Sequence, residues 1–388
     1  MTIRGGAAAL ALCTTLSCTT LSAAAVVPPG SGWVPASTGY TVVADHLNNP
    51  RQITVAHGDL YVAEAGTGGT VCPVTGVCVG FTGSVTRVHQ GQASRPQTGL
   101  LSLSTPHGEV LGADAVAADD TGLFAVVSGS CALAASQVPA AVVAQAGRVL
   151  RLLGGADVRP LGDASGPACA TAGTGAGLEA TDPYGLALAD GTFWVADAAA
   201  GDVVRLTATS AAQSSLATPA TVALSARQLS AVAAPASGDG PRLAPTALAV
   251  GPDGALYLAT MGAGAAPGAD AVYRIDPGTS TATVYAGRLN AVTGLAFDQR
   301  GTLYVCEWTT GYSRSGPGPD GDVVAIPWGA GGSERQVLGA GVLHFPGGVA
   351  VLDGAVYVSN WSIAGGEDGP LGPGVHGQLV RLGSSRAG

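Results

Sequence analysis

A short apolar strand with an aromatic residue at its centre recurs six times along the chain. The copies read G-D-L-Y-V-A-E, T-G-L-F-A-V-V, G-T-F-W-V-A-D, G-A-L-Y-L-A-T, G-T-L-Y-V-C-E and G-A-V-Y-V-S-N, and they end at Glu64, Val127, Asp197, Thr260, Glu307 and Asn360. The aromatic residues lie 47 to 70 residues apart, so the connecting segments vary in length while the strand does not. Such repeats are typical of arrays in which each unit buries its apolar faces against its neighbours.

Two further strands accompany each copy. An apolar strand precedes it, beginning at Pro50, Ala113, Pro183, Pro245, Val292 and Pro346. A strand of the type G-D-V-V-R-L follows it, and five of the six carry an arginine, at Arg87, Arg151, Arg205, Arg274 and Arg381. Turns such as Pro252-Asp253-Gly254 join the first two strands as a hairpin. Near-continuous apolar strands fit sheets covered on both faces, so we predict an all-β fold, a six-bladed β-propeller.

The last unit lacks its own outer strand. In two earlier units an outer strand follows the third strand, with the sequences T-A-T-V-Y-A-G-R-L and R-Q-V-L-G-A-G-V. After Arg381 of the last unit only seven residues remain, which are too few for such a strand. Tyr40–Leu47, Y-T-V-V-A-D-H-L, has the same pattern at the other end of the chain. We therefore expect the N-terminal strand to complete the last blade and close the ring, which removes the open sheet edges of the array.

The first residues have the pattern of an export signal. Arg4 precedes an apolar run from Ala7 to Leu16, and small residues follow at positions 23–25. This predicts a secretory signal peptide over residues 1–25, a Pro/Gly-rich linker over 26–39 and the propeller over 40–388. We expect a secreted protein without a membrane span, because no later stretch offers about 20 apolar residues. Lipidation at Cys18 is the alternative that we weight less, because Thr15 stands where a lipoprotein signal usually has Leu.

Composition excludes one class of partner. The chain has 388 residues, with 60 glycines, 24 prolines, a net charge of −9 and no lysine. Nucleic-acid binding needs clustered positive charge, and the sequence contains no basic stripe. We expect a monomer that binds an unidentified small molecule, glycan or protein at one mouth of its channel.

Five cysteines remain after the predicted signal peptide. Cys72 and Cys78 flank a short Gly/Pro loop, and Cys131 and Cys169 each lie in an irregular segment, so we predict two disulfides in the exported protein. Cys306 lies within an apolar strand and is expected to be a buried free thiol. Zinc is the alternative, but the Cys-x5-Cys spacing without a nearby His matches no common ligand set.

Two segments interrupt the repeat. Residues 128–146 are rich in Ala, Val and Ser and predict a short helix over 137–145. Residues 207–243 are rich in Ala, Ser and Thr and predict a loop or an extended outer strand over one face.

Together the copies resemble six-bladed propellers of the NHL-repeat and gluconolactonase-like kind. The block from Leu47 to Val88, with L-N-N-P-R, L-Y-V-A-E-A-G-T-G-G and C-P-V-T-G-V-C-V-G-F-T-G-S-V-T-R-V, is similar to the ScyD/ScyE family of exported propellers, named for scytonemin biosynthesis clusters. The resemblance covers about residues 40–383. It implies fold and export, and it carries over no catalytic residue.

In a propeller, the first strand of a blade starts on the face where the second strand ends. The second-strand ends therefore bring Glu64, Asp197, Glu307 and Asn360 toward one mouth, together with Thr260 and Val127. Ca²⁺ prefers several oxygen ligands, so these four residues are the candidate metal site. The alternative, which we favour, is that these side chains accept hydrogen bonds from turn N–H groups or pair with arginine.

The first strands offer few ligands at the same mouth. Gluconolactonase-like propellers, which this chain resembles, place metal-binding Glu, Asn and Asp there, whereas the aligned residues here are Arg51, Asp114, Tyr184, Thr246, Thr293 and Gly347. Asp114 is the one ligand candidate among them. We expect Arg51 to pair with Glu64 of its own blade. The repeated third-strand arginines share one structural position, which favours bonds or ion pairs between blades over a ligand site.

No residue pattern specifies a nucleophile. The histidines occupy unlike repeat positions and no G-x-S-x-G motif occurs. His344 and His376 are candidate general bases, and Trp308, Tyr312 and Trp361 are candidates for an aromatic lip; exposed turns and loop packing are the alternatives. The sequence therefore favours a binding or interaction module without a catalytic residue. A Ca²⁺-dependent hydrolase, lactonase or lyase of the gluconolactonase-like superfamily is the alternative.

Overall fold

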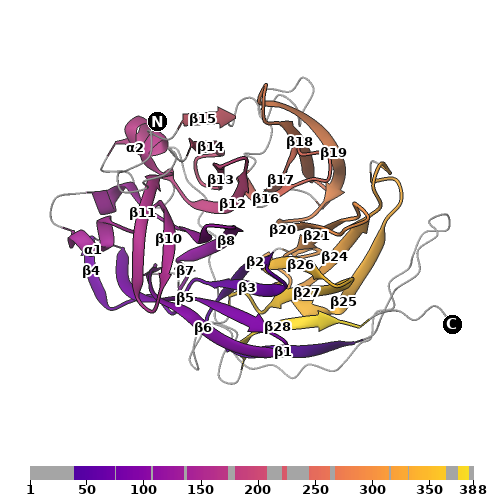
Figure 1. Ribbon diagram of the computed structural model, residues 1–388, viewed down its shortest axis with the longest axis horizontal. Helices are drawn as coiled ribbons and strands as arrows, with labels where there is room; N and C mark the ends of the chain where they lie inside the picture. The colour runs from indigo at the N-terminus through magenta and orange to yellow at the C-terminus, as the bar shows by residue number, and fades with distance from the viewer. Residues whose placement is uncertain are drawn as a thin grey trace.

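The computed structural model describes residues 39–74, 76–105, 108–134, 138–173, 180–207, 221–224, 244–262, 267–313, 316–330, 332–363 and 375–383. These residues form six antiparallel sheets arranged around a central axis (Figure 1). The predicted six-bladed propeller is confirmed. The predicted signal peptide and nearly all of the predicted linker lie outside the described residues.

Blade 1 is the largest sheet. It contains β2 (Pro50–Ala56), β3 (Asp59–Glu64), β5 (Val77–His89), β6 (Gln92–Ser104) and β7 (Val110–Leu111), with β4 (Val71–Val74) paired to β5. Blade 2 contains β8 (Ala113–Asp119), β9 (Gly122–Val127), β10 (Arg148–Gly154) and β11 (Asp157–Asp163). Blade 3 contains β12 (Pro183–Ala189), β13 (Thr192–Asp197), β14 (Asp202–Thr207) and β15 (Thr221–Leu224).

The second half of the ring repeats this order. Blade 4 contains β16 (Ala244–Val250), β17 (Leu256–Met261), β18 (Asp270–Asp276) and β19 (Thr281–Leu289). Blade 5 contains β20 (Val292–Phe297), β21 (Leu303–Glu307), β24 (Asp320–Ile326) and β25 (Gln336–His344), and a small hairpin of β22 (Tyr312–Ser313) and β23 (Gly316–Pro317) lies in its loop. Blade 6 contains β26 (Gly348–Leu352), β27 (Ala355–Asn360), β28 (Gly377–Leu382) and β1 (Tyr40–Leu47).

The first strand of each blade lies next to the axis. β2, β8, β12, β16, β20 and β26 contact one another in sequence, and β26 contacts β2 to complete the circle (Figure 1). β1 pairs with β28 from Tyr40↔Leu382 to Leu47↔Gly377, so the N-terminal strand closes the ring as predicted. Ala44 and Leu47 of this strand are buried in a core with Leu60 of blade 1 and Leu379 of blade 6.

The repeated aromatic residue packs between neighbouring blades. The ring of Tyr257 in blade 4 lies 4.8 Å from that of Phe297 in blade 5 and 5.0 Å from that of Tyr285, both edge to face. Phe124 of blade 2 contacts Phe193 of blade 3 in the same manner at 4.9 Å. Such edge-to-face pairs add to the free energy of burying the rings, which explains why the repeat retains a large ring at the centre of the second strand.

Four of the five third-strand arginines, Arg87, Arg151, Arg205 and Arg274, contact residues of their own blades, which corrects the prediction of contacts between blades. Arg87 pairs with Asp59, and Arg274 donates to Asp253 at 2.7 Å; both acceptors lie at the hairpin that joins the first two strands. Arg151 donates to the carbonyl of Thr121 in the corresponding hairpin. The arginine stands directly opposite the aromatic residue of the second strand, as in Tyr61↔Arg87, so its head reaches the hairpin rather than the next blade.

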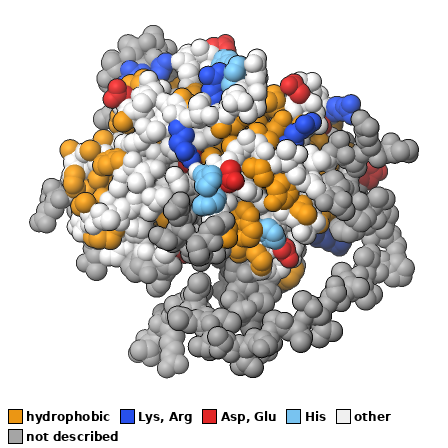
Figure 2. Space-filling model, turned by 90° about the horizontal axis from the view of Figure 1, so that it is seen from below, with side chains coloured by type: hydrophobic (Ala, Val, Ile, Leu, Met, Phe, Trp, Pro, Cys, Tyr) orange, Lys and Arg blue, Asp and Glu red, His pale blue; other side chains and the backbone are white. Residues whose placement is uncertain are grey.

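Surface charge is sparse. Figure 2 shows acidic and basic side chains scattered among neutral and hydrophobic ones, without a basic stripe on the face in view. No helix among the described residues is long and apolar enough to span a membrane.

Where the structure describes the irregular segments, their helices are short. A 3-10 helix covers Cys131–Ala134, α1 covers Ala140–Val143 and α2 covers Gly166–Ala172. The helix predicted over 137–145 is therefore shorter than expected, and residue 137 lies outside the described part of the chain. Of residues 208–243, only β15 is described.

Both predicted disulfides are present. Cys72 is bonded to Cys78 across 6 residues and Cys131 to Cys169 across 38, and Cys306 is a buried free cysteine. Burial raises the pKa of the Cys306 thiol well above its usual range, so this group stays protonated.

The two disulfides are expected to differ in their effect on stability. Loop-closure entropy predicts about 4 kcal/mol for the Cys131–Cys169 bond and about 2 kcal/mol for the Cys72–Cys78 bond, because the first closes the longer loop. The Cys131→Ser/Cys169→Ser protein should therefore unfold at a lower urea concentration than the Cys72→Ser/Cys78→Ser protein. The reverse order would show that loop closure does not set their contributions.

Candidate functional site

Four polar side chains at the ends of the second strands form hydrogen bonds with the backbone segment that precedes the first strand of the same blade. Each accepts a hydrogen bond from a backbone N–H just before the first strand, at the same distance of 2.7 Å. The pairs are Asn48 with Glu64, Asp182 with Asp197, Asn290 with Glu307, and His344 with Asn360. All four acceptors are buried. The spacing of 15 to 17 residues in each pair shows that this bond is part of the repeat.

The structure does not bring these four residues together as a metal site. Each has its own partners: Glu64 also accepts from Thr86 at 2.6 Å and from Arg95 at 2.9 Å, and Glu307 lies beside Asp322. Within the ranges that the structure describes, no group of three or more His, Cys, Asp or Glu side chains is placed to hold a metal ion. The donor set predicted for Ca²⁺ therefore does not fit this ion.

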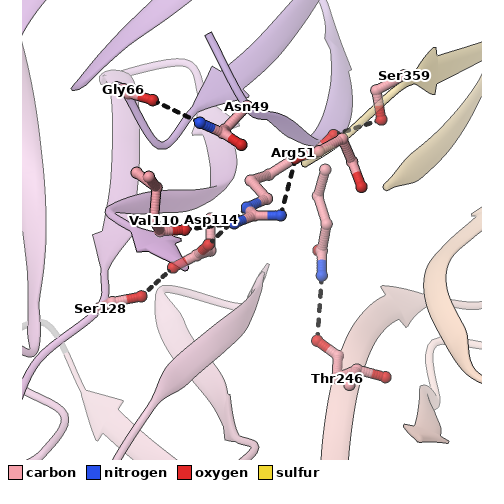
Figure 3. A network of polar contacts seen from close by, with 10 residues as sticks. Asn49, Arg51, Gly66, Val110, Asp114, Ser128, Thr246 and Ser359 are labelled. Carbon is pink, nitrogen blue, oxygen red and sulfur yellow. Dashed lines mark hydrogen bonds and ion pairs between the residues drawn. The ribbon is translucent and has the colours of Figure 1, made fainter. Parts of the chain in front are cut away.

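Arg51 occupies the mouth of the channel. Its Nη1 donates to the carbonyl of Ser362 at 3.0 Å, its Nη2 to the carbonyl of Val110 at 2.6 Å, and its Nε lies 3.3 Å from Oδ1 of Asp114 (Figure 3). The guanidinium thus ties blade 1 to blades 2 and 6. The prediction that Arg51 pairs with Glu64 was wrong, because Arg95 of β6 takes that carboxylate instead.

Asp114, which is fully buried, and Asp182, which is partly buried, are two carboxyl groups near this arginine. Ser128 donates to Oδ2 of Asp114, while Oδ1 of Asp182 is buried and accepts no hydrogen bond from the described residues. Burial raises the pKa of Asp114 to about 8, although Arg51 lowers it and Asp182 raises it further. Burial likewise raises the pKa of Asp182 to about 6, with a further rise from Asp197. One arginine beside two such carboxyls favours a proton held within the cluster near neutral pH.

Tyr184 extends the cluster into blade 3. Burial raises the pKa of its hydroxyl, and the charges of Arg51, Asp114 and Asp182 act on it. The group remains a neutral donor at physiological pH. The mouth therefore presents a cation, two carboxyls and a phenol, a set suited to hydrogen bonding with a polar ligand.

Gln52 crosses the channel just below this cluster. Its Nε2 donates to the carbonyl of Thr246 on the opposite side of the ring at 3.1 Å, the contact that ends at Thr246 in Figure 3. Beyond it, toward the other face, lies a cavity of about 330 Å³ lined by the second halves of the first strands, with residues such as Ile53, Leu186 and Phe297. The channel thus has charged and polar side chains at one end and mainly apolar side chains with exposed strand backbone at the other.

The other predicted site residues pack against their neighbours. The His344 ring stacks on Trp361 with ring centres 4.5 Å apart, and its Nδ1 lies 3.3 Å from Oδ1 of Asp320. Trp308 packs on Phe345 at 4.9 Å. His376 contacts His46 rather than the cluster. The side chain of Tyr312 lies outside the described part of the chain.

Sequence reasoning named Arg51 and Asp114 but missed Gln52, Ser128 and Asp182. Asp182 directly precedes the strand that begins at Pro183, a position that is Asn49 in blade 1 and Gly112 in blade 2. A carboxylate at a repeat position that is neutral in other blades was a signal available from the sequence. Gln52 and Ser128 carried none, because their partners lie 194 and 14 residues away in directions that only the fold defines.

The buried carboxyls predict a loss of stability as pH rises. Their pKa values of about 6 and about 8 in the folded protein exceed the value of about 3.9 in an unfolded chain. The folded protein therefore binds more protons, and the stability that these groups contribute is complete below about pH 4 and lost as pH rises through about 8. Urea unfolding from pH 5 to 9 measures this slope, which should be smaller in Asp114→Asn. Equal slopes in both proteins would contradict it.

Comparison with known proteins relates part of the chain to one family. The sequence model of the family described as SMP-30/Gluconolactonase/LRE-like region matches residues 173–312. This part of the chain matches the gluconolactonase-like family. The matched part runs from the end of α2 to β22 and includes Asp182, Tyr184 and Asp197. No curated protein sequence matches the chain.

Similar solved structures include propellers with different descriptions. A putative gluconolactonase is 12% identical with a TM-score of 0.48, over 91% of this chain and 94% of its own. Regucalcin, a calcium-binding protein from Agrobacterium tumefaciens, is 11% identical with a TM-score of 0.47, over 91% and 96%. A chain from a nidogen/laminin complex is 14% identical with a TM-score of 0.44, over 74% and 86%.

Proposed function

We propose that this protein is an exported propeller of the ScyD/ScyE type that binds a polar small molecule or glycan at the channel mouth, without covalent chemistry. The observation that carries the proposal is the cluster of Arg51, Asp114, Asp182 and Tyr184. Its Asp182 Oδ1 is buried without a hydrogen-bond donor among the described residues. A buried acceptor of this kind costs free energy until a donor reaches it.

The ligand that suits this mouth carries several hydroxyl groups. A hydroxyl donates to Asp182 and accepts from Tyr184, which stays protonated because burial raises its pKa. Arg51 is less available, since its contacts with Ser362, Val110 and Asp114 already use its guanidinium. We therefore favour a neutral polyol or glycan over a strongly anionic ligand.

The binding test uses thermal shift with a panel of neutral sugars, sugar acids and lactones. We expect a neutral sugar to raise the melting temperature and the rise to disappear in Asp182→Asn and in Tyr184→Phe. Asp298→Asn is the control, because Asp298 lies in the hairpin between β20 and β21 of blade 5, at the end of the blade away from the mouth, and Asn keeps an oxygen that accepts the turn N–H groups. A shift that survives both mouth variants places the ligand elsewhere and contradicts the proposal.

A metal-dependent lactonase is the second candidate, and the family match over residues 173–312 favours it. Under this hypothesis Ca²⁺ binds the folded protein, so millimolar Ca²⁺ should raise the melting temperature by mass action. Lactone hydrolysis should then depend on the ion and fall in Asp182→Asn. An unchanged melting temperature together with no hydrolysis of aldonolactones supports the binding module.

Export is part of the proposal. Two disulfides are typical of oxidising compartments, and the sequence of residues 1–25 has the features of a signal peptide. Expression of the full sequence in a bacterial host with a secretory pathway, followed by N-terminal sequencing of the mature protein, tests it. We expect cleavage after residue 25. A protein that stays in the cytoplasm with residues 1–25 still attached would contradict export.

A further inference from the structure

Two histidines meet where the N-terminal strand closes the ring. His46 lies near the end of β1, and His376 directly precedes Gly377, the residue that pairs with Leu47. Their ring centres lie 4.1 Å apart, with the rings tilted by 43°. His46 is exposed and His376 is partly exposed, so solutes reach both rings. Figure 2, which looks from below onto the side where β1 lies in Figure 1, shows histidine side chains at the surface there.

The backbone of β1 is shaped to place His46 beside its neighbour. The register shifts between Ala44↔Leu379 and Leu47↔Gly377, and His46 adopts a φ of 56°, in the left-handed region. Irregularities of this kind turn a side chain away from the direction that a regular strand gives it. The left-handed conformation costs free energy in a residue with a Cβ. The strand therefore holds the imidazole at this position at some cost.

The charges around the two rings favour a cation. Asp45 directly precedes His46, and its Oδ1 accepts the backbone N–H of His46 at 2.8 Å. Arg95 donates to the carbonyl of His46 at 2.8 Å, but its positive charge is paired with Glu64 at 2.9 Å. The carboxylate of Asp45 thus remains as the nearest negative charge among the described residues in contact with His46.

We propose that His46 and His376 form a two-histidine site for a first-row divalent transition ion, which fastens the N-terminal strand to the last blade. Imidazole suits Zn²⁺, Ni²⁺ and Cu²⁺. Two rings that share one ion at about 2.0–2.1 Å from each nitrogen lie roughly 4.5–5 Å apart, so a small rotation of these accessible side chains admits it. Water completes the coordination. The site is separate from the channel mouth and does not depend on the proposed function.

The ion is expected to stabilise the closed ring, because unfolding separates residues 46 and 376 and destroys the site. Mass action then raises the melting temperature of untagged, metal-free protein by about 2 °C or more in Ni²⁺ or Zn²⁺ well above the dissociation constant. Mg²⁺ and Ca²⁺, which prefer oxygen ligands, should leave it unchanged. Calorimetric titration with Ni²⁺ should show one ion per chain, released by a chelator.

The variants His46→Asn and His376→Asn test the assignment separately. Asn tolerates the left-handed backbone of position 46, so both proteins should fold and lose the Ni²⁺ effect. His57→Asn is the matched control, because His57 is exposed and has a φ of 51°, and it should retain the effect. The proposed site is wrong if Ni²⁺ raises the melting temperature of His46→Asn or His376→Asn as much as that of the unaltered protein. It is also wrong if the unaltered protein shows neither a shift nor a binding heat, since the rings would then only pack together.

Discussion

Removal of residues 26–47 is expected to lower the stability of the protein by about 5 kcal/mol or more. The truncation deletes β1, whose Ala44 and Leu47 are 6% and 3% exposed, and loss of a buried leucine alone costs about 2–5 kcal/mol. It also leaves β28 as an open edge, which is a template for association with other chains. Urea unfolding and size-exclusion chromatography measure the two effects.

A shorter truncation is the control for this experiment. A protein that begins at residue 39 lacks the predicted signal peptide and linker but retains β1, so we expect it to unfold like the chain that begins at residue 26. Equal stability of the proteins that begin at residues 39 and 48 would show that the pairing of β1 with β28 contributes nothing to the ring.

Replacement of Arg51 by methionine is expected to destabilise the protein by about 3–5 kcal/mol. Arg51 is 8% exposed and Asp114 is fully buried, so the variant leaves Asp114 without its cation and keeps its carboxyl protonated, with the loss of the ion pair. The carbonyls of Ser362 and Val110 lose their donors as well. Because these bonds join blades 1, 2 and 6, we expect the loss to appear in global unfolding rather than in one local transition.

A double variant separates charge from packing. In Arg51→Met/Asp114→Leu neither charge remains, and replacing a buried pair by apolar residues is often far less costly than breaking it. We therefore expect the double variant to be more stable than Arg51→Met. If it is less stable by the sum of the single effects, the two side chains do not interact, and the 3.3 Å contact between them carries no stabilisation.

The repeat explains why the fold was predictable. Each strand contributes the same aromatic, apolar and hairpin signals six times, so one weak copy such as T-G-L-F-A-V-V does not change the assignment. The closure by Tyr40–Leu47 followed from a missing strand at one end and an extra strand at the other. The two disulfides followed from an export signal and two pairs of cysteines in irregular segments.

The site was less predictable because side-chain partners are not repeated. Glu64 and Arg51 belong to one blade and have opposite charges, but they do not pair with each other. Glu64 forms an ion pair with Arg95, and Arg51 forms one with Asp114. The third-strand arginines were assigned to neighbouring blades, although a strand position opposite the aromatic residue directs them to their own hairpin. The partner of each charged side chain depends on the length and direction of that side chain in the folded protein. The sequence alone does not show these directions.

The hydrogen bond from Gln52 to Thr246 affects how solutes can move along the axis of the propeller. An open axis would let water and solutes pass from one face to the other. The Gln52 side chain reaches across it to the carbonyl of Thr246, so this amide stands in the path from one face to the other. A molecule that enters at the mouth therefore meets this side chain before it reaches the cavity beyond. Gln52→Gly would remove this side chain from the axis and leave the carbonyl of Thr246 without its donor.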